Sequence, residues 1–225
     1  SQLNIKEIMS YKVLFIDEES TQHDIFKDHF EANWPEAEIV CAFPASTIKE
    51  MLNEIDKIHP DAIIVDYQLN DKKEDIRYNV CYNGVELLNA IHNQLSDFPS
   101  FVLTSYDGEA VEDSDDVNFV YVKKVLYFSS ADGEKVSFAQ RVKSQIDKYR
   151  IRIDNARKDL LYLIDKREKG EATAQDEERI VELDTFLEKT YGNEDSVPAG
   201  LKQMSNLEKL NTLIEKVDYL INKMN

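Results

Sequence analysis

The stretch Val13-Leu14-Phe15-Ile16-Asp17-Glu18-Glu19 joins four consecutive apolar residues to three acids. Strands that are apolar throughout, instead of alternating, are those buried on both faces of a parallel sheet. Further short apolar runs follow at residues 39–42, 62–65, 101–103 and 117–122. Stretches with the spacing of amphipathic helices separate them, at 22–33, 46–58 and 84–95. The alternation predicts an α/β domain built on a five-stranded, doubly wound parallel sheet.

In the second half of the chain, the apolar residues follow the spacing of helices instead of that of strands. After about residue 134 the strand signals stop, and apolar residues recur in steps of four and three, at Val142, Ile146, Tyr149, Ile153, Ala156, Leu160 and Leu163. Gly170 should end this helix, and Thr173 should open a second one with Asp176 or Glu177 as its capping-box partner. A third apolar seam runs from Leu207 to Met224. We therefore expect an α/β domain over 10–134, whose last helix could extend to about 169, and an all-α bundle or coiled-coil module of three helices over 135–225.

The composition narrows the class of protein. Of the 225 residues, 27 are Lys or Arg and 44 are Asp or Glu, which gives a formal charge of -17. Residues 1–130 carry -15 of it, so non-specific binding to nucleic acid or to an anionic membrane is not expected. Residues 135–169 are basic, at +6, but 170–225 carry -6, and the two can face each other. With two cysteines, no zinc-ligand spacing and no apolar run of about 20 residues, the sequence predicts a cytoplasmic protein.

Chemically active residues follow the predicted strands. Ligands of open parallel sheets bind outside the carboxyl ends of the strands. The residues at these ends are Asp17, Glu18, Asp66, Thr104, Ser105, Lys123 and Lys124. Carboxylates held together repel one another, and a hard divalent cation with oxygen ligands, of which Mg²⁺ is the common intracellular choice, relieves the repulsion. The predicted ligands are Asp17, Glu18, Asp66 and the backbone carbonyl of Gln68.

The same set suits the acceptance of a phosphoryl group. A carboxylate can take up the group while a metal ion and an ammonium offset the developing negative charge. The hydroxyl of Thr104 can donate a hydrogen bond to a phosphoryl oxygen. The expected chemistry is therefore transfer of a phosphoryl group to an aspartate.

Four features, taken in order along the chain, resemble the receiver domain of two-component response regulators. They are the acidic pair after the first strand, the strand ending in Asp66, the Leu103-Thr104-Ser105 strand end and the Val122-Lys123 strand end. The resemblance covers roughly residues 11–145 and implies a flavodoxin-like receiver fold and a histidine kinase or other phosphodonor as partner. Carried over position by position, the family's roles fall on a phosphoacceptor, Asp66; two metal-binding acids, Asp17 and Glu18; a switch hydroxyl, Thr104, with Ser105 beside it; a phosphate-contacting lysine, Lys123 or Lys124; and a switch aromatic, Tyr121.

Three features depart from the family pattern. The family usually has a Pro shortly after the phosphoacceptor and then a short loop to a Gly that opens the next helix. Here Leu69 is followed by Asn70, and Gly84 lies 18 positions after Asp66, so a polar insertion over 71–82 stands beside the site as a lid or partner surface. The site lysine lacks its following Pro. In the family, the switch aromatic usually lies three positions before the site lysine, which would pair Tyr121 with Lys124. The end of the predicted strand instead favours Lys123 as the site lysine, so the choice between the two lysines stays open.

The leading hypothesis is a non-enzymatic switch: Asp66 accepts a phosphoryl group with Mg²⁺ and relays the change to a helical module that oligomerises or binds a protein partner. The alternative is a pseudo-receiver scaffold that docks partners without accepting phosphate. A haloacid dehalogenase-like phosphatase ranks last, because such sites need an Asp-x-Asp pair where this chain has Asp17-Glu18-Glu19. Whether the helical seams close within one chain or between two copies is left open by the periodicity.

Overall fold

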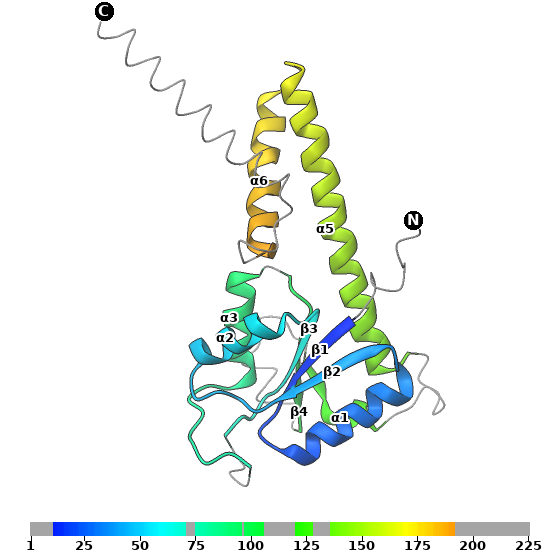
Figure 1. Cartoon of the computed structure of the whole chain (residues 1–225), viewed down its shortest axis with the longest axis vertical. Helices are drawn as coiled ribbons and strands as arrows, with labels where there is room; N and C mark the ends of the chain where they lie inside the picture. The colour runs from blue at the N-terminus through cyan, green and yellow to red at the C-terminus, as the bar shows by residue number, and fades with distance from the viewer. Residues whose placement is uncertain (1–10, 71–74, 96, 106–119, 128–135, 192–225) are drawn as a thin grey trace, which may run out of the picture. The chain divides into compact units, whose positions relative to one another are not determined.

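The structure is a computed structural model that describes residues 11–70, 75–95, 97–105, 120–127 and 136–191. The chain divides into two compact units, Ser1–Ala156 and Arg157–Asn225. The long helix α5 (Phe138–Glu168) runs across this boundary (Figure 1). The division into a 10–134 domain and a 135–225 module stays a prediction.

The first unit holds a parallel sheet. Its strands are β1 (Tyr11–Ile16), β2 (Ala37–Ala42), β3 (Ala62–Asp66), β4 (Ser100–Thr104) and β5 (Val120–Val122). They lie in the order β2-β1-β3-β4-β5, and every neighbouring pair is parallel. This is the flavodoxin-like order, in which the direction of winding reverses between β1 and β3. The predicted fold class is confirmed; of the fifth predicted run, residues 117–119 lie outside the described residues.

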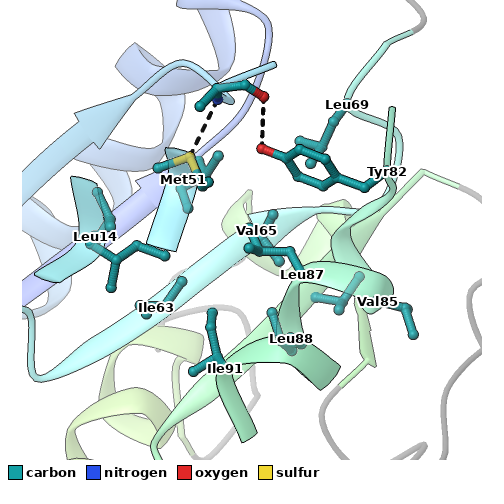
Figure 2. Packing of buried hydrophobic residues seen from close by; sticks show 14 of the residues in the cluster. Leu14, Met51, Ile63, Val65, Leu69, Tyr82, Val85, Leu87, Leu88 and Ile91 are labelled. Atoms are coloured by element: carbon teal, nitrogen blue, oxygen red, sulfur yellow. Dashed lines mark hydrogen bonds between the residues drawn. The ribbon is translucent and has the colours of Figure 1, made fainter. Parts of the chain in front are cut away.

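Helices pack against both faces of the sheet, because neighbouring strand residues point to opposite sides. On one face, Leu14, Ile63 and Val65 pack with residues of α2 (Ile48–Ile58) and α3 (Gly84–Gln94), as Figure 2 shows. On the other face, the apolar cluster combines strand residues with α1 (Ser20–Asn33) and the first part of α5, through Val13, Phe15, Ile64, Phe101, Phe26, Phe30, Phe138, Val142 and Ile146. The continuous apolar runs are thus explained by burial on two sides.

The first part of α5 is also tied to the amino-terminal end of the strands. The Tyr11 hydroxyl donates a 2.7 Å hydrogen bond to Asp147, and Arg150 forms a 2.7 Å ion pair with Asp61. The cationic groups of Lys143 and Arg150 lie 4.8 and 4.4 Å from the centre of the Tyr11 ring. These contacts fix residues 143–150 of α5 at the amino-terminal ends of the strands. The acids lie at the opposite, carboxyl ends.

In the second unit, α5 ends and α6 (Ala174–Tyr191) begins. The predicted seam residues Leu160, Leu163, Ile180, Leu183 and Leu187 are all buried. Thr173 opens α6, and Asp176 is its capping-box partner, since each accepts a hydrogen bond from the other's backbone N–H at 3.3 and 2.7 Å. Glu177 instead binds Arg167 through two hydrogen bonds.

The third predicted helix, with its seam from Leu207 to Met224, lies outside the described residues. Among the helices that the structure does describe, every one is too short or too polar to cross a lipid bilayer.

Candidate functional site

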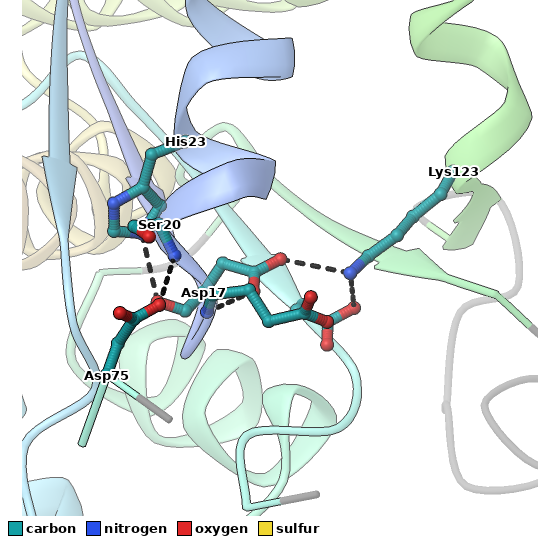
Figure 3. A network of polar contacts seen from close by, with 7 residues as sticks. Asp17, Ser20, His23, Asp75 and Lys123 are labelled. Atoms are coloured by element: carbon teal, nitrogen blue, oxygen red, sulfur yellow. Dashed lines mark hydrogen bonds and ion pairs between the residues drawn. The ribbon is translucent and has the colours of Figure 1, made fainter. Parts of the chain in front are cut away.

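The predicted site residues come together at the carboxyl edge of the sheet. Asp17 and Glu18 follow β1, Asp66 is the last residue of β3, Thr104 ends β4, and Lys123 follows β5 as the first residue of a 3₁₀ helix, η3 (Lys123–Leu126). Parallel strands bring all their carboxyl ends to one edge, so residues distant in the sequence meet there. Figure 3 shows the Lys123 ammonium reaching Asp17.

Lys123 bridges two acids. Its Nζ lies 3.0 Å from Asp17 Oδ2 and 3.1 Å from Asp66 Oδ1, and the exposed fractions of the three side chains are 11%, 0% and 7%. Burial acts to lower the pKa of Lys123, but the attraction of Asp66 and Asp17 outweighs it and raises that pKa. The lysine is therefore held as an ammonium between two carboxyl groups.

The acids outnumber the cation. Glu18 is 2% exposed, and its Oε2 is buried without a hydrogen-bond partner among the described residues. Burial raises the pKa of Glu18 to about 7, and the charge of Asp17 contributes to the rise. Burial also raises the pKa of Asp17 and of Asp66, against the opposing effect of Lys123. One ammonium thus lies among three buried carboxyl groups and pairs with two of them.

This arrangement fits a divalent cation. Carboxylate oxygens of Asp17, Glu18 and Glu19 lie within 4.8 Å of one another. Hard cations such as Mg²⁺ take oxygen ligands, and a buried carboxylate oxygen without a partner is available to become one. Asp66 is linked to Asp17 by the shared Lys123. The chemistry of these donors therefore suits a hard divalent cation such as Mg²⁺. Glu19 joins the cluster without having been among the predicted ligands, and Asp66 as a ligand stays a prediction.

Hydrogen bonds hold the turn that carries the acids. Asp17 Oδ1 accepts a 2.9 Å hydrogen bond from the backbone N–H of Glu19. The buried His23 lies with Nε2 2.9 Å from the backbone oxygen of Asp17. Because a carbonyl oxygen can only accept, Nε2 must carry the proton. His23 thus supports the backbone of Asp17, although no sequence pattern connects it with the site.

The remaining predicted residues are placed differently. Thr104 is buried and directly follows Leu103, the residue of β4 that pairs with Asp66 of β3. Ser105 is exposed. Gln68 is half-buried, and its carbonyl as a metal ligand stays a prediction.

The structure shows which of the two lysines lies beside the acids. Lys123 makes both ion pairs, while Lys124 is exposed. Tyr121 therefore stands two positions before the lysine at the site. Its ring packs against Phe101 and Phe138, with centroids 6.0 and 5.1 Å away. The role of Tyr121 as a switch stays a prediction.

Gly84 opens α3, the helix that follows β3, as the resemblance implies. Its N–H donates a 2.9 Å hydrogen bond to the carbonyl of Tyr67. A Cβ at this position would lie 2.3 Å from the backbone oxygen of Asp66, closer than atoms can approach. The start of α3 therefore needs a residue without a side chain in order to pack against Asp66.

Part of the insertion before Gly84 is buried, although its sequence is mostly polar. Residues 71–74 lie outside the described residues, but Ile76, Val80 and Tyr82 are buried in the cluster that contains α2 and α3. Their spacing of four and two positions is the only sequence signal of this burial, and the surrounding charges obscure it.

On a flavodoxin-like sheet, an acidic edge with a bridging lysine is the arrangement that the resemblance to receiver domains implies. No protein-family model matches the chain, and no curated protein matches it. Solved receiver domains of response regulators are similar to it in fold.

Three solved structures illustrate this similarity. The BeF3-activated receiver domain of DrrB has 19% identity and a TM-score of 0.42, covering 62% of this chain and 99% of that one. The CheY-like receiver domain protein from Methanospirillum hungatei JF-1 has 18% identity and a TM-score of 0.42, covering 62% and 96%. The anti-anti-sigma factor PhyR from Bartonella quintana has 18% identity and a TM-score of 0.46, covering 66% and 51%. The fold assignment itself rests on the strand order and register of this chain.

Proposed function

We propose that this chain is a phosphorylation-dependent signalling switch in which Asp66 is the phosphoacceptor. The observation that carries the proposal is the bridge from Lys123 to Asp17 and Asp66 beside the unpartnered oxygen of Glu18. It supports the proposal because a carboxylate, an ammonium and a carboxylate oxygen available to a metal ion lie at one edge of the sheet.

The proposed reaction transfers a phosphoryl group to Asp66. A carboxylate oxygen of Asp66 forms a bond to phosphorus while the bond from phosphorus to the donor's leaving atom breaks. The leaving group departs with that electron pair and takes its proton from solvent. Hydrolysis of the acyl phosphate by water reverses the change, so the chain modifies and restores its own side chain and turns over no separate substrate. A histidine kinase or a small phosphorylated molecule would be the donor.

The surrounding residues have distinct roles in this proposal. Asp17, Glu18, Asp66 and the carbonyl of Gln68 would hold Mg²⁺, which when bound offsets the negative charge on the phosphoryl oxygens. Lys123 would exchange its contact with Asp66 Oδ1 for a phosphoryl oxygen. Thr104, at the end of the neighbouring strand, would donate a hydrogen bond to another.

A route from the site to α5 supports the relay to a helical module. Lys123 begins η3, and the carbonyl of Leu126 at its other end lies 2.9 Å from Nδ1 of the buried His29. Leu126 belongs to the same apolar cluster as Phe138 at the start of α5. A displacement of Lys123 on phosphorylation would therefore act on the packing of α5, because close-packed cores respond by discrete repacking.

The alternative function is a pseudo-receiver scaffold, and one observation favours it. The ion pairs of Lys123 already compensate Asp17 and Asp66 in part, so the cluster can serve as a structural link between strand ends. In that case the first unit would dock partners regardless of phosphorylation.

Light scattering with beryllofluoride, a phosphoryl mimic, distinguishes the two functions. A switch should change its assembly state when Mg²⁺ and beryllofluoride are added, and Asp66→Asn should abolish the response. Asp24→Ala, an exposed carboxylate on α1, is the matched control and should respond like the wild type. An unchanged assembly state in the wild type would favour the scaffold.

A further inference from the structure

Helix α1 begins directly after the acidic turn, and its own N-cap residue does not cap it. Glu19 makes no side-chain capping hydrogen bond, whereas α2 and α3 both start with complete capping boxes, at Thr47 and Asn83. The cap comes instead from Asp75, whose Oδ2 accepts a 2.9 Å hydrogen bond from the backbone N–H of Ser20. The two residues are 55 positions apart (Figure 3). Hydrogen bonds from Ser20 lower the pKa of Asp75, so it caps as a carboxylate.

Asp75 lies on a segment that is itself anchored. We call residues 75–82 the inserted strap. Ile76 and Val80 are 2% and 5% exposed, and the N–H of Val80 donates a 3.0 Å hydrogen bond to Asn70 Oδ1.

Two tyrosines extend the anchoring to the connection between β2 and α2. Tyr78 and Tyr82 donate hydrogen bonds of 2.8 and 2.9 Å to the carbonyls of Pro44 and Ala45. The inserted strap thereby joins the connections that follow β1, β2 and β3.

The inserted strap acts on the backbone that carries the cation ligands. The N–H of Glu19 is fixed by Asp17, the carbonyl of Asp17 by His23, and the N–H of Ser20 by Asp75. Glu18, with its unpartnered carboxylate oxygen, lies between these points. Ligand sites require positions accurate to about 0.5 Å, and that accuracy comes from the residues that support the ligands. Of these three hydrogen bonds, only the one that Asp75 accepts from Ser20 depends on the inserted strap.

We propose that Asp75 is a positioning residue for the cation site and that docking of the inserted strap and binding of Mg²⁺ favour each other. The proposal rests on the Mg²⁺ site of the proposed function. Coupling between two binding events is reciprocal: if the docked strap raises the affinity for Mg²⁺ by some factor, Mg²⁺ raises the population of docked strap by the same factor.

The first test is an NMR titration with Mg²⁺ of the wild type, Asp75→Ala, Asp75→Asn and Thr47→Ala. Asp75→Ala should weaken Mg²⁺ binding about fivefold or more, within the usual range of coupling. Asp75→Asn keeps an oxygen that can accept from Ser20, so it should retain most of the affinity. Thr47→Ala removes an equivalent cap from α2 and should lower the melting temperature without changing the affinity.

The second test measures docking of the inserted strap directly, as the rate of trypsin cleavage after the exposed Arg77. Cleavage requires the strap to open, so its rate follows the undocked population. Mg²⁺ should slow cleavage in the wild type by the factor seen in the titration, and a higher Mg²⁺ concentration should be needed for the same slowing in Glu18→Gln. Equal Mg²⁺ affinities in wild type and Asp75→Ala, or cleavage insensitive to Mg²⁺, would overturn the coupling and leave the proposed function standing. Failure of the wild type to bind Mg²⁺ would instead remove the proposed cation site, and the coupling with it.

Discussion

Binding of Mg²⁺ to this chain should release protons at neutral pH. Asp17 and Asp66 share the Lys123 ammonium, Glu18 lies beside them, and burial raises the pKa of each of the three acids. A cation binds the carboxylate form, so any acid that is protonated in the metal-free protein must lose its proton first. Glu18, with a pKa of about 7, changes its charge near neutral pH.

The size of the effect follows from that pKa. With a pKa of about 7, roughly 9% of Glu18 is ionised at pH 6 and roughly 91% at pH 8. The apparent affinity for Mg²⁺ should therefore rise about tenfold over this interval from Glu18 alone. Asp17 and Asp66 shift in the same direction and can only steepen the rise.

The assay is calorimetry at pH 6, 7 and 8 in buffers of different protonation enthalpy, which counts protons released for each Mg²⁺ bound. Glu18→Gln has almost the same shape without the titrating group, so it should bind Mg²⁺ less tightly at pH 8 and release about one proton fewer at pH 6. A wild-type affinity that is constant between pH 6 and 8, or an equal proton release in Glu18→Gln, would refute the reasoning.

Three further predictions concern stability. Because the pKa of Glu18 is raised on folding, the metal-free protein should lose stability as the pH rises from about 4.5 to 7, and Glu18→Gln should regain on the order of 2 kcal/mol at pH 8 in urea unfolding. Lys123→Met leaves buried acids unpaired and should cost about 3–5 kcal/mol at pH 8 and less at pH 5, while the exposed control Lys124→Met should be near neutral. Gly84→Ala brings a methyl group against the Asp66 carbonyl and should cost about 1–3 kcal/mol, which a thermal melt would detect. A neutral Lys123→Met or Gly84→Ala would mean that these contacts are not formed in solution.

The sheet could be predicted because its signals are local. Two-sided burial leaves continuous apolar runs, and the residue after each run is fixed at the sheet edge by the strand itself. The capping residue Thr173 was predicted for the same reason, since its partner Asp176 lies three positions away. The strand ends alone therefore predict that Asp17 and Asp66 lie at this edge of the sheet.

The contacts between strand ends needed the structure. Lys123 and Lys124 both follow the fifth apolar run, and the ion pairs with Asp17 and Asp66 show that Lys123 is the lysine that turns toward the acids. The cap from Asp75 to Ser20 crosses 55 positions and leaves no periodic signal. Such long-range contacts depend on how loops pack, which no local pattern records.

The central claim is that Asp66 accepts a phosphoryl group, and intact-mass spectrometry tests it most directly. The wild type and Asp66→Asn would be incubated with Mg²⁺ and a small phosphodonor such as acetyl phosphate, with EDTA as the metal-free control. The account predicts the added mass of one phosphoryl group in the wild type only, and its loss when EDTA replaces Mg²⁺. No added mass in the wild type, or an equal addition to Asp66→Asn, would contradict it.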